Sequence, residues 1–437
     1  MKLFLICAEK SGSNIIKQVL ERLQKDGANL QDIEMRGVVY DDVATEFHVK
    51  PLFLPSEIAV LGIGDILTSI PRIVSKINLT AKEIATWSPD LVLSVDAYDF
   101  CFRVVKKAKQ MGAQTKFIHI VAPSVWAYWS GRAKNVVKYF DHLFYLLPFE
   151  KKYFPSNDKA KKKEEWSEKK YISQDNQEDV EIEADSAKTE MPEWFLQDIE
   201  SCKKRKKIQT ARCNNFTATF VGFPATFQER DEGIVKDKKL IGITVGSRRG
   251  EIERHKNIML SALARLRLMD KNLHFVVLAT PDFHEELQQF FAPVKNISVV
   301  SDEAEKRQMI QKCQLVISKS GTNSIEIGAL GTAMIVYYKV AKMTAMFARM
   351  FAKIRFVNLF NITMHRMIVP ELIQSNATAE NIANLAYRMV NDDTIINEQL
   401  HNVKHAISMM QNRDGKPIEI ISSGLKKMMK NCKIKGN

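Results

Sequence analysis

The chain has 437 residues, a net charge of +13 and an isoelectric point near 9.2. This length is too great for one ordinary hydrophobic core, so we expect two domains. The positive balance favours polyanionic partners: nucleic acid, anionic lipid or a phosphorylated substrate. The six cysteines are scattered without a C-x-x-C pair, which is typical of reduced thiols rather than of disulfides or a zinc site.

The N-terminal residues do not resemble a signal peptide. Residues 1–8 form a short apolar run without a cleavage region, so we interpret them as a first strand. No uninterrupted apolar stretch reaches the length of a membrane-spanning helix. We therefore expect a soluble, cytoplasmic protein whose membrane contact is limited to its surface.

The first part of the chain alternates short apolar runs with segments of helical periodicity. The helix predicted over residues 14–25 gathers Ile15, Ile16, Val19, Leu20 and Leu23 on one face. Further helices are predicted over 57–88 and from about 131, with strands over 3–8, 35–39, 91–95, 116–121 and 142–146. This alternation predicts a parallel sheet with helices on both faces.

The composition changes between residues 156 and 215, where charged residues replace most apolar ones. Lysine-rich runs at 161–163 and 203–207 flank an acidic run around 178–185. Such a segment cannot bury enough apolar surface to form a core, so we predict a disordered insertion. The basic run at 203–207 also fits a nucleic-acid or localisation patch. In a charge-balanced segment we favour a solvated linker, and nucleic acid is the least favoured partner.

From about residue 216 the alternation resumes. Strands are predicted over 218–221, 239–245, 274–279, 297–300, 315–318 and 333–337, and helices over 254–268, 283–290, 307–312, 323–329 and 379–390. We therefore expect an α/β protein with two Rossmann-like, doubly wound domains, over 1–155 and 216–400. The charged insertion 156–215 separates them, and a basic helical tail follows over 401–437. In such folds the ligand binds at the carboxyl ends of the strands, in the crevice between the domains.

Two strand-turn-helix segments in the second half point to a nucleotide-sugar. Ser320, Gly321 and Thr322 follow an apolar strand and precede a helix, so their N–H groups can bind a diphosphate. Glu326, within that helix, is suited to ribose hydroxyls, although an acidic residue is also ordinary in a first helical turn. The earlier segment follows its strand with a glycine turn and a cation, at Gly246, Ser247 and Arg248. The planar guanidinium of Arg248 suits phosphate oxygens.

An ordered set of short motifs identifies a family. They are residues 8–13 (A-E-K-S-G-S), 58–63 (I-A-V-L-G-I), 96–100 (D-A-Y-D-F), 122–128 (A-P-S-V-W-A-Y), 147–150 (L-P-F-E), 220–224 (F-V-G-F-P), 246–252 (G-S-R-R-G-E-I) and 320–326 (S-G-T-N-S-I-E). Each motif is weak alone, but their order over nearly the whole chain is specific. The chain resembles the lipid-A-disaccharide synthase family, which are inverting glycosyltransferases of the two-lobed GT-B type.

The resemblance implies a reaction between two lipid-linked sugars. The sugar of UDP-2,3-diacylglucosamine is transferred to the 6-hydroxyl of 2,3-diacylglucosamine 1-phosphate, giving a β-1′,6-linked disaccharide and UDP. It also implies a peripheral position on the cytoplasmic face of a Gram-negative inner membrane, with contact to anionic lipid, and a homodimer formed through the C-terminal part. No cofactor and no metal are expected, because arginine and helix dipoles can stabilise the leaving diphosphate.

The resemblance also suggests roles for residues of the first half. Asp99 is the expected base that deprotonates the acceptor hydroxyl, and Asp96 orients Asp99 or a substrate. Either aspartate could instead cap the following helix. The turn of Glu9, Ser11 and Gly12 faces the same crevice, with Glu9 as a further catalytic candidate. Trp126 and Arg132 are expected to contact the sugar and the acceptor phosphate, although Trp126 suits core packing equally well.

Some positions depart from the family pattern, namely Ala8, Lys10, Ser13 and Phe223. These departures keep open the hypothesis of a non-catalytic protein that retains a nucleotide or lipid pocket. A second alternative is another GT-B transferase or epimerase that uses a UDP-sugar, which would keep the Ser320–Thr322 turn and Glu326 without needing the motifs at 96–100 and 122–128. Two stretches, 66–77 and 343–356, place apolar residues beside cations. This composition fits helices that lie on a membrane surface as well as amphipathic helices packed on the core.

Overall fold

The computed structural model describes residues 1–58, 64–127, 131–154, 216–340 and 355–434. The predicted insertion at 156–215 and nearly all of the apolar stretch at 343–356 lie outside the described residues. Within these ranges no helix is both long and apolar enough to cross a membrane.

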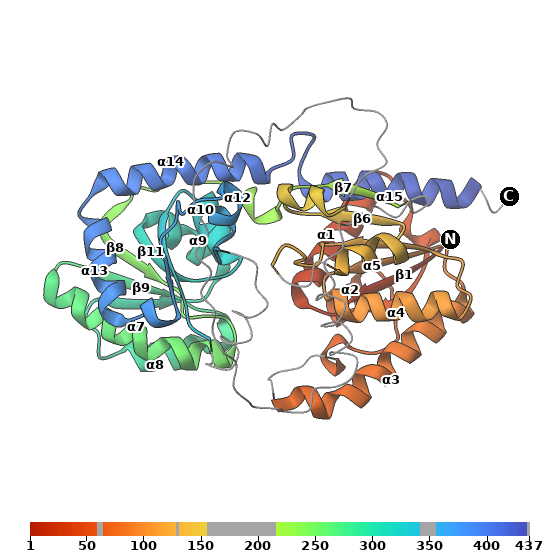
Figure 1. Ribbon diagram of the computed structural model, residues 1–437, viewed down its shortest axis with the longest axis horizontal. Coiled ribbons are helices and arrows are strands. Elements are labelled where there is room, and N and C mark those ends of the chain that lie inside the picture. Colours follow the sequence, from red (N-terminus) through yellow and green to blue (C-terminus); the bar gives the residue numbers. More distant parts are fainter. Residues whose placement is uncertain (59–63, 128–130, 155–215, 341–354, 435–437) are drawn as a thin grey trace, which may run out of the picture.

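The described chain forms two lobes, each built on a parallel sheet (Figure 1). The first sheet has the order β3-β2-β1-β4-β5-β6-β7 and the second the order β10-β9-β8-β11-β12-β13. The strands of the first are β1 (Lys2–Cys7), β2 (Glu34–Val38), β3 (Lys50–Pro51), β4 (Leu91–Val95), β5 (Lys116–Ile120), β6 (His142–Tyr145) and β7 (Thr217–Phe220). Those of the second are β8 (Asp237–Ile243), β9 (His274–Leu278), β10 (Ile297–Val300), β11 (Cys313–Lys319), β12 (Ala333–Tyr338) and β13 (Glu371–Ile373).

Helices cover both faces of each sheet. The first lobe contains α1 (Lys10–Lys25), α2 (Asp41–Glu46), α3 (Gly64–Trp87), α4 (Tyr98–Gln110), α5 (Arg132–Tyr139) and α15 (Pro417–Ile434). The second contains α7 (Arg249–Met269), α8 (His284–Phe291), α9 (Glu303–Lys312), α10 (Asn323–Ala329), α12 (Leu359–Met364), α13 (Ala379–Val390) and α14 (Asp393–Met410). The doubly wound α/β architecture predicted from the alternation is confirmed.

The apolar runs of the central strands follow from burial on both faces. In β1, Leu3 and Leu5 pack with Leu20 of α1, whereas Phe4 and Ile6 pack with residues of α3 and α4 on the opposite side. Successive side chains of a strand point to opposite faces, so a strand covered on both sides needs apolar residues at every position.

The last strand of the first sheet corrects the sequence prediction. The strand predicted over 218–221 was expected to open the second domain, but it forms β7, which pairs in parallel with β6 of the first sheet. The predicted C-terminal tail also returns to the first lobe, because α15 packs on α1 (Figure 1). Ser422 on α15 donates a hydrogen bond to the Val19 carbonyl, 3.4 Å away. The elements β3, α2, α12 and β13 were not predicted.

The chain passes between the lobes twice, at residues 220–226 and at residues 410–412, and these two crossings lie side by side. The Phe223 N–H donates to the Met410 carbonyl at 2.9 Å, and the Gln411 side chain donates to the Thr226 carbonyl at 2.8 Å. Gly222 has a φ of +86°, and a Cβ at this position would lie 2.8 Å from the Asn412 nitrogen. This close approach requires glycine, so the crossing at 222 is adapted to the crossing at 412.

Candidate active site

The predicted site residues of the first lobe follow neighbouring strands. Glu9 and Ser11 come after β1, and Asp96 and Asp99 come after β4, which pairs with β1. The Ser11 hydroxyl lies 3.4 Å from the Asp96 carboxylate, to which it donates. The carboxyl ends of adjacent parallel strands meet at one sheet edge, which is where this fold class binds ligands.

The backbone at this edge is strained. Asp96 and Ala97 have φ values of +55° and +41°, and Val121, directly after β5, has a φ of +75°. Residues other than glycine seldom adopt positive φ values, and β-branched residues such as valine adopt them least. Strain of this kind is concentrated at functional sites, where the surrounding structure fixes it.

Glu9 is close to charged groups of both lobes. Although much of Glu9 is exposed to solvent, partial desolvation by the protein raises the pKa of its carboxyl. The Asp96 carboxylate raises this pKa further, whereas the Arg248 guanidinium of the second lobe lowers it. The predicted catalytic turns of the first lobe therefore lie within electrostatic reach of the predicted phosphate-binding turn of the second.

Asp99 and Arg132 form an ion pair. One guanidinium nitrogen of Arg132 lies 2.9 and 2.8 Å from the two carboxylate oxygens of Asp99. The Arg132 guanidinium also lies over the Tyr98 ring, 5.7 Å from its centre. The Asp99 side chain stays 59% exposed, so its oxygens can accept further hydrogen bonds from the crevice. Neither aspartate caps α4, whose N-cap residue is Ala97 without a side-chain bond.

Gly12 and Trp126 have packing contacts in addition to their predicted roles. A Cβ on Gly12 would lie 3.3 Å from Val95, so the glycine lets α1 approach the end of β4. The half-buried ring of Trp126 packs edge-on against Phe149 at 5.4 Å. These contacts agree with the structural alternative that the sequence left open for Trp126.

In the second lobe, the two predicted nucleotide-binding turns follow the paired strands β8 and β11. Gly246 has a φ of +124°, and a Cβ there would lie 2.6 Å from the Cβ of Glu251. Ser247 and Arg248 follow it and are exposed. Ser320 is buried and donates its N–H to the Tyr337 carbonyl at 3.0 Å. Gly321 and Thr322 are exposed, so the two turns are open to a ligand.

Glu326 has a protein partner. Its carboxylate lies 3.6 Å from Nε of Arg307, and its side chain is 27% exposed. This ion pair is consistent with an ordinary acidic residue in the first turn of α10. A ribose contact stays a prediction.

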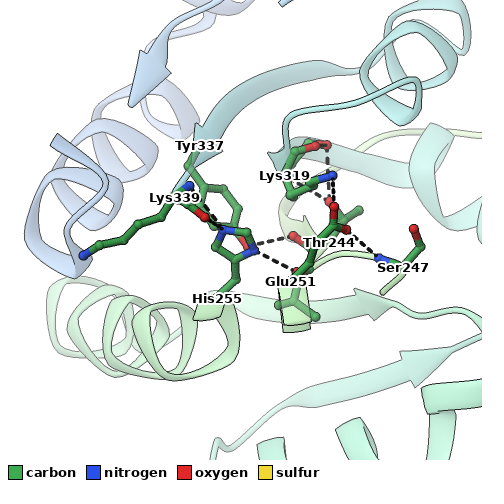
Figure 2. A network of polar contacts seen from close by, with 9 residues as sticks. Thr244, Ser247, Glu251, His255, Lys319, Tyr337 and Lys339 are labelled. Atoms are coloured by element: carbon green, nitrogen blue, oxygen red, sulfur yellow. Dashed lines mark hydrogen bonds and ion pairs between the residues drawn. The ribbon is translucent and has the colours of Figure 1, made fainter. Parts of the chain in front are cut away.

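Two residues of this region were not singled out from the sequence. Lys319 ends β11 immediately before Ser320, and Glu251 lies in the first turn of α7. Their side chains form an ion pair at 2.7 Å between the two turns (Figure 2). Glu251 appeared only as a letter of a family motif. A lysine placed just before a small-residue turn was the one signal for Lys319.

Two facing parallel α/β lobes, with these turns at the carboxyl ends of their strands, define the GT-B fold. A family model described as lipid-A-disaccharide synthetase matches residues 3–195 and 221–421. The match spans most of the sequence, so the chain belongs to the lipid-A-disaccharide synthetase family.

Curated relatives agree with this membership. The lipid-A-disaccharide synthase of Rickettsia canadensis (strain McKiel) is 31% identical over 384 residues, covering 88% of this chain and 86% of that protein. The lipid-A-disaccharide synthase of Rhodospirillum centenum (strain ATCC 51521 / SW) is 27% identical over 427 residues, covering 95% and 91%.

Solved structures share the fold. The UDP-GlcNAc 2-epimerase from Neisseria meningitidis, bound to UDP-GlcNAc, has a TM-score of 0.53 at 15% identity, covering 98% of this chain and 100% of that one. The calicheamicin glycosyltransferase CalG4 has a TM-score of 0.51 at 10% identity, covering 98% of each chain. At this identity the likeness concerns the fold alone.

Proposed function

We propose that this protein transfers the sugar of UDP-2,3-diacylglucosamine to the 6-hydroxyl of 2,3-diacylglucosamine 1-phosphate. The products are the β-1′,6-linked disaccharide 1-phosphate and UDP. Family membership supports this reaction. The structural observation that supports it best is the placement of Asp99 after β4 in the first lobe and of Arg248 after β8 in the second, each at the carboxyl end of a parallel strand, because an inverting transfer needs a base and a diphosphate-binding cation beside one crevice.

In this proposal the second lobe binds UDP. The N–H groups of the exposed residues Gly321 and Thr322 and the guanidinium of Arg248 stabilise the diphosphate as negative charge develops on it. Glu326 contacts the ribose after exchanging Arg307 for the sugar hydroxyls. These groups stabilise the leaving UDP, so the bond to the anomeric carbon breaks more easily.

Asp99 is the proposed base. Its ion pair with Arg132 fixes its orientation, and its exposed oxygens can accept the proton of the acceptor hydroxyl. Arg132 also offers positive charge to the acceptor phosphate. Asp96 and Ser11 support the strained turn beside it, and Trp126 forms an apolar wall for the sugar.

The replacement Asp99→Asn tests the reaction and the base together. We expect purified wild-type protein to form disaccharide and UDP in equal amounts in detergent micelles, and the variant to lose about 10²–10⁴-fold in kcat. UDP affinity, measured by calorimetry, should stay unchanged because the UDP turns lie in the other lobe. Wild-type turnover by the variant would exclude Asp99 as the base. UDP binding by the wild type without any product would contradict the reaction and favour another acceptor.

The proposed location is the cytoplasmic face of the inner membrane, because substrates with several acyl chains do not diffuse freely in water. On α3, Ile70 and Val74 lie one helical turn apart beside Arg72, and Val74 is 48% exposed. This arrangement fits a helix that dips its apolar side into a lipid surface. The side chains of residues 66–69, in the first part of the predicted interfacial stretch, lie outside the described residues.

Sedimentation with vesicles that contain phosphatidylglycerol tests this contact. Val74→Asp should lower the bound fraction several-fold, because a carboxylate is repelled by anionic lipid and removes an apolar contact. Met111→Asp is the matched control, since Met111 is similarly exposed, at 46%, after the end of a different helix. Equal losses in both variants would count against a specific role for α3.

A further inference from the structure

The ion pair of Glu251 and Lys319 lies between the two turns that follow β8 and β11. Its nitrogen and oxygen are 2.7 Å apart, and the side chains are only 11% and 17% exposed. Figure 2 shows the two side chains meeting between the strand ends. Screening by solvent is weak for a pair this buried, so its geometry is well fixed.

Glu251 also binds the first turn. Its second carboxylate oxygen accepts the N–H of Ser247 at 3.2 Å, and its Cβ is the atom that excludes a side chain at Gly246. Burial raises the pKa of Glu251, but the Lys319 ammonium and the Ser247 N–H together more than offset burial and keep this pKa below its usual range. One ionised carboxylate therefore joins Ser247 to the end of β11.

Lys319 lies beside the second turn. A Cβ on Gly321 would be 3.8 Å from the Lys319 ammonium, which also lies 5.5 Å from the centre of the Tyr338 ring. The ammonium is thus placed next to the Ser320–Thr322 turn, whose Gly321 and Thr322 are exposed, as well as next to Glu251.

The backbone beneath this pair is fixed by a separate set of contacts. The Lys319 N–H donates to the Thr244 hydroxyl at 2.9 Å, and the Tyr337 hydroxyl donates to the Thr244 carbonyl at 2.9 Å. His255 is within hydrogen-bond distance of the Val245 and Lys339 carbonyls (Figure 2). The strand ends are therefore anchored without the ion pair. The pair instead contributes to the position of the two turns that follow these strands.

We propose that Lys319, oriented by Glu251, is a positioning residue for the diphosphate. The pair fixes the Ser247 turn against the Ser320–Thr322 turn, and the ammonium adds a second positive charge beside that of Arg248. This inference rests on the proposed function, since it assumes that the two turns bind UDP. The alternative is a purely structural ion pair, whose loss would change stability without distinguishing phosphate from uridine.

Calorimetric titration of the full-length protein with UDP and with uridine separates these roles. Lys319→Met should weaken UDP binding about tenfold or more, as expected for loss of one charge-assisted contact. Glu251→Gln should have a similar effect, because the Lys319 ammonium then loses the partner that holds it in position. Uridine affinity should stay within about twofold of wild type, because uridine lacks the phosphates. The double variant should lose no more UDP affinity than the single variant that binds UDP less tightly, because the two residues act as one unit.

Controls make the test decisive. Arg249→Met removes an ion pair with Glu286 from the same end of α7 and should leave UDP affinity unchanged. A single variant that leaves an unpaired buried charge could unfold. The double variant carries no such charge, and the inference requires that its UDP affinity also falls below that of the wild type. Wild-type UDP affinity in the double variant, or equal losses for UDP and uridine, would overturn the inference. Failure of the wild type to bind UDP would instead contradict the proposed function.

Discussion

At the scale of single residues, Glu150 is a buried carboxylic acid just after β6. It is 3% exposed, and it accepts the N–H of Leu147 at 3.0 Å. Burial raises its pKa from 4.5 to about 8 despite this hydrogen bond. The folded protein therefore retains this proton at neutral pH, whereas the unfolded chain releases it.

This difference predicts how stability depends on pH. A carboxyl with a raised folded-state pKa makes its full contribution to the free energy of unfolding below about pH 4.5. This contribution is lost as the pH rises through about 8. Glu150→Gln carries no titrating proton and should flatten this decline between pH 5 and pH 8. Urea unfolding at several pH values in that window measures the effect. The same slope in the wild type and the variant would show that Glu150 does not titrate in this way.

Sequence reasoning at this scale found turns more readily than side-chain pairs. Gly246 and Ser320 were predicted because each follows an apolar strand and precedes a helix, a pattern visible within ten residues. Asp99 and Arg132 were predicted for separate roles, and the structure joins them. The pair of Glu251 and Lys319 spans 68 residues, and a contact between two distant turns leaves no periodic pattern in the sequence.

At the scale of elements, most strands and helices were predictable because burial on both sheet faces produces continuous apolar runs. The partner of a strand was not equally predictable. The segment 217–220 follows the insertion and looks like the first strand of a new domain, but β7 completes the first sheet. The short β3 and β13 were missed because two or three residues give no periodicity.

The packing of α15 on the first lobe can be tested by truncating one side chain. Leu425 is 2% exposed within the core that also contains Leu20 of α1. Leu425→Ala should lower the free energy of unfolding by about 2–5 kcal/mol through loss of apolar burial and formation of a cavity. Lys430→Ala, at an exposed position of the same helix, should change it little. Denaturant unfolding compares the two, and equal stability would mean that α15 is not docked as described.

At the scale of the whole molecule, the paired crossings at 220–226 and 410–412 set how the lobes face each other. Gly222→Ala forces a Cβ to within 2.8 Å of the Asn412 nitrogen and should displace one crossing from the other. We expect kcat to fall about tenfold or more, because small misplacements of reacting groups are costly. UDP affinity should be unchanged, since the second lobe remains intact.

Gly27→Ala is the matched control for this replacement. Gly27 has a nearly identical φ of +81°, but nothing lies within 4 Å of its Cβ position. The same backbone strain is therefore introduced without the contact between the crossings. An equal loss of kcat in both variants would trace the effect to backbone strain rather than to lobe placement.

The return of the C-terminal helix to the first lobe has a consequence for biosynthesis. While the ribosome is still making the second lobe, the first sheet already has all its strands, but the face of α1 that α15 covers remains bare. At about 5–20 residues per second, this interval is on the order of 10–40 s. The lobe that is synthesised first is therefore completed last, and its uncovered apolar surface is a binding target for chaperones on the nascent chain.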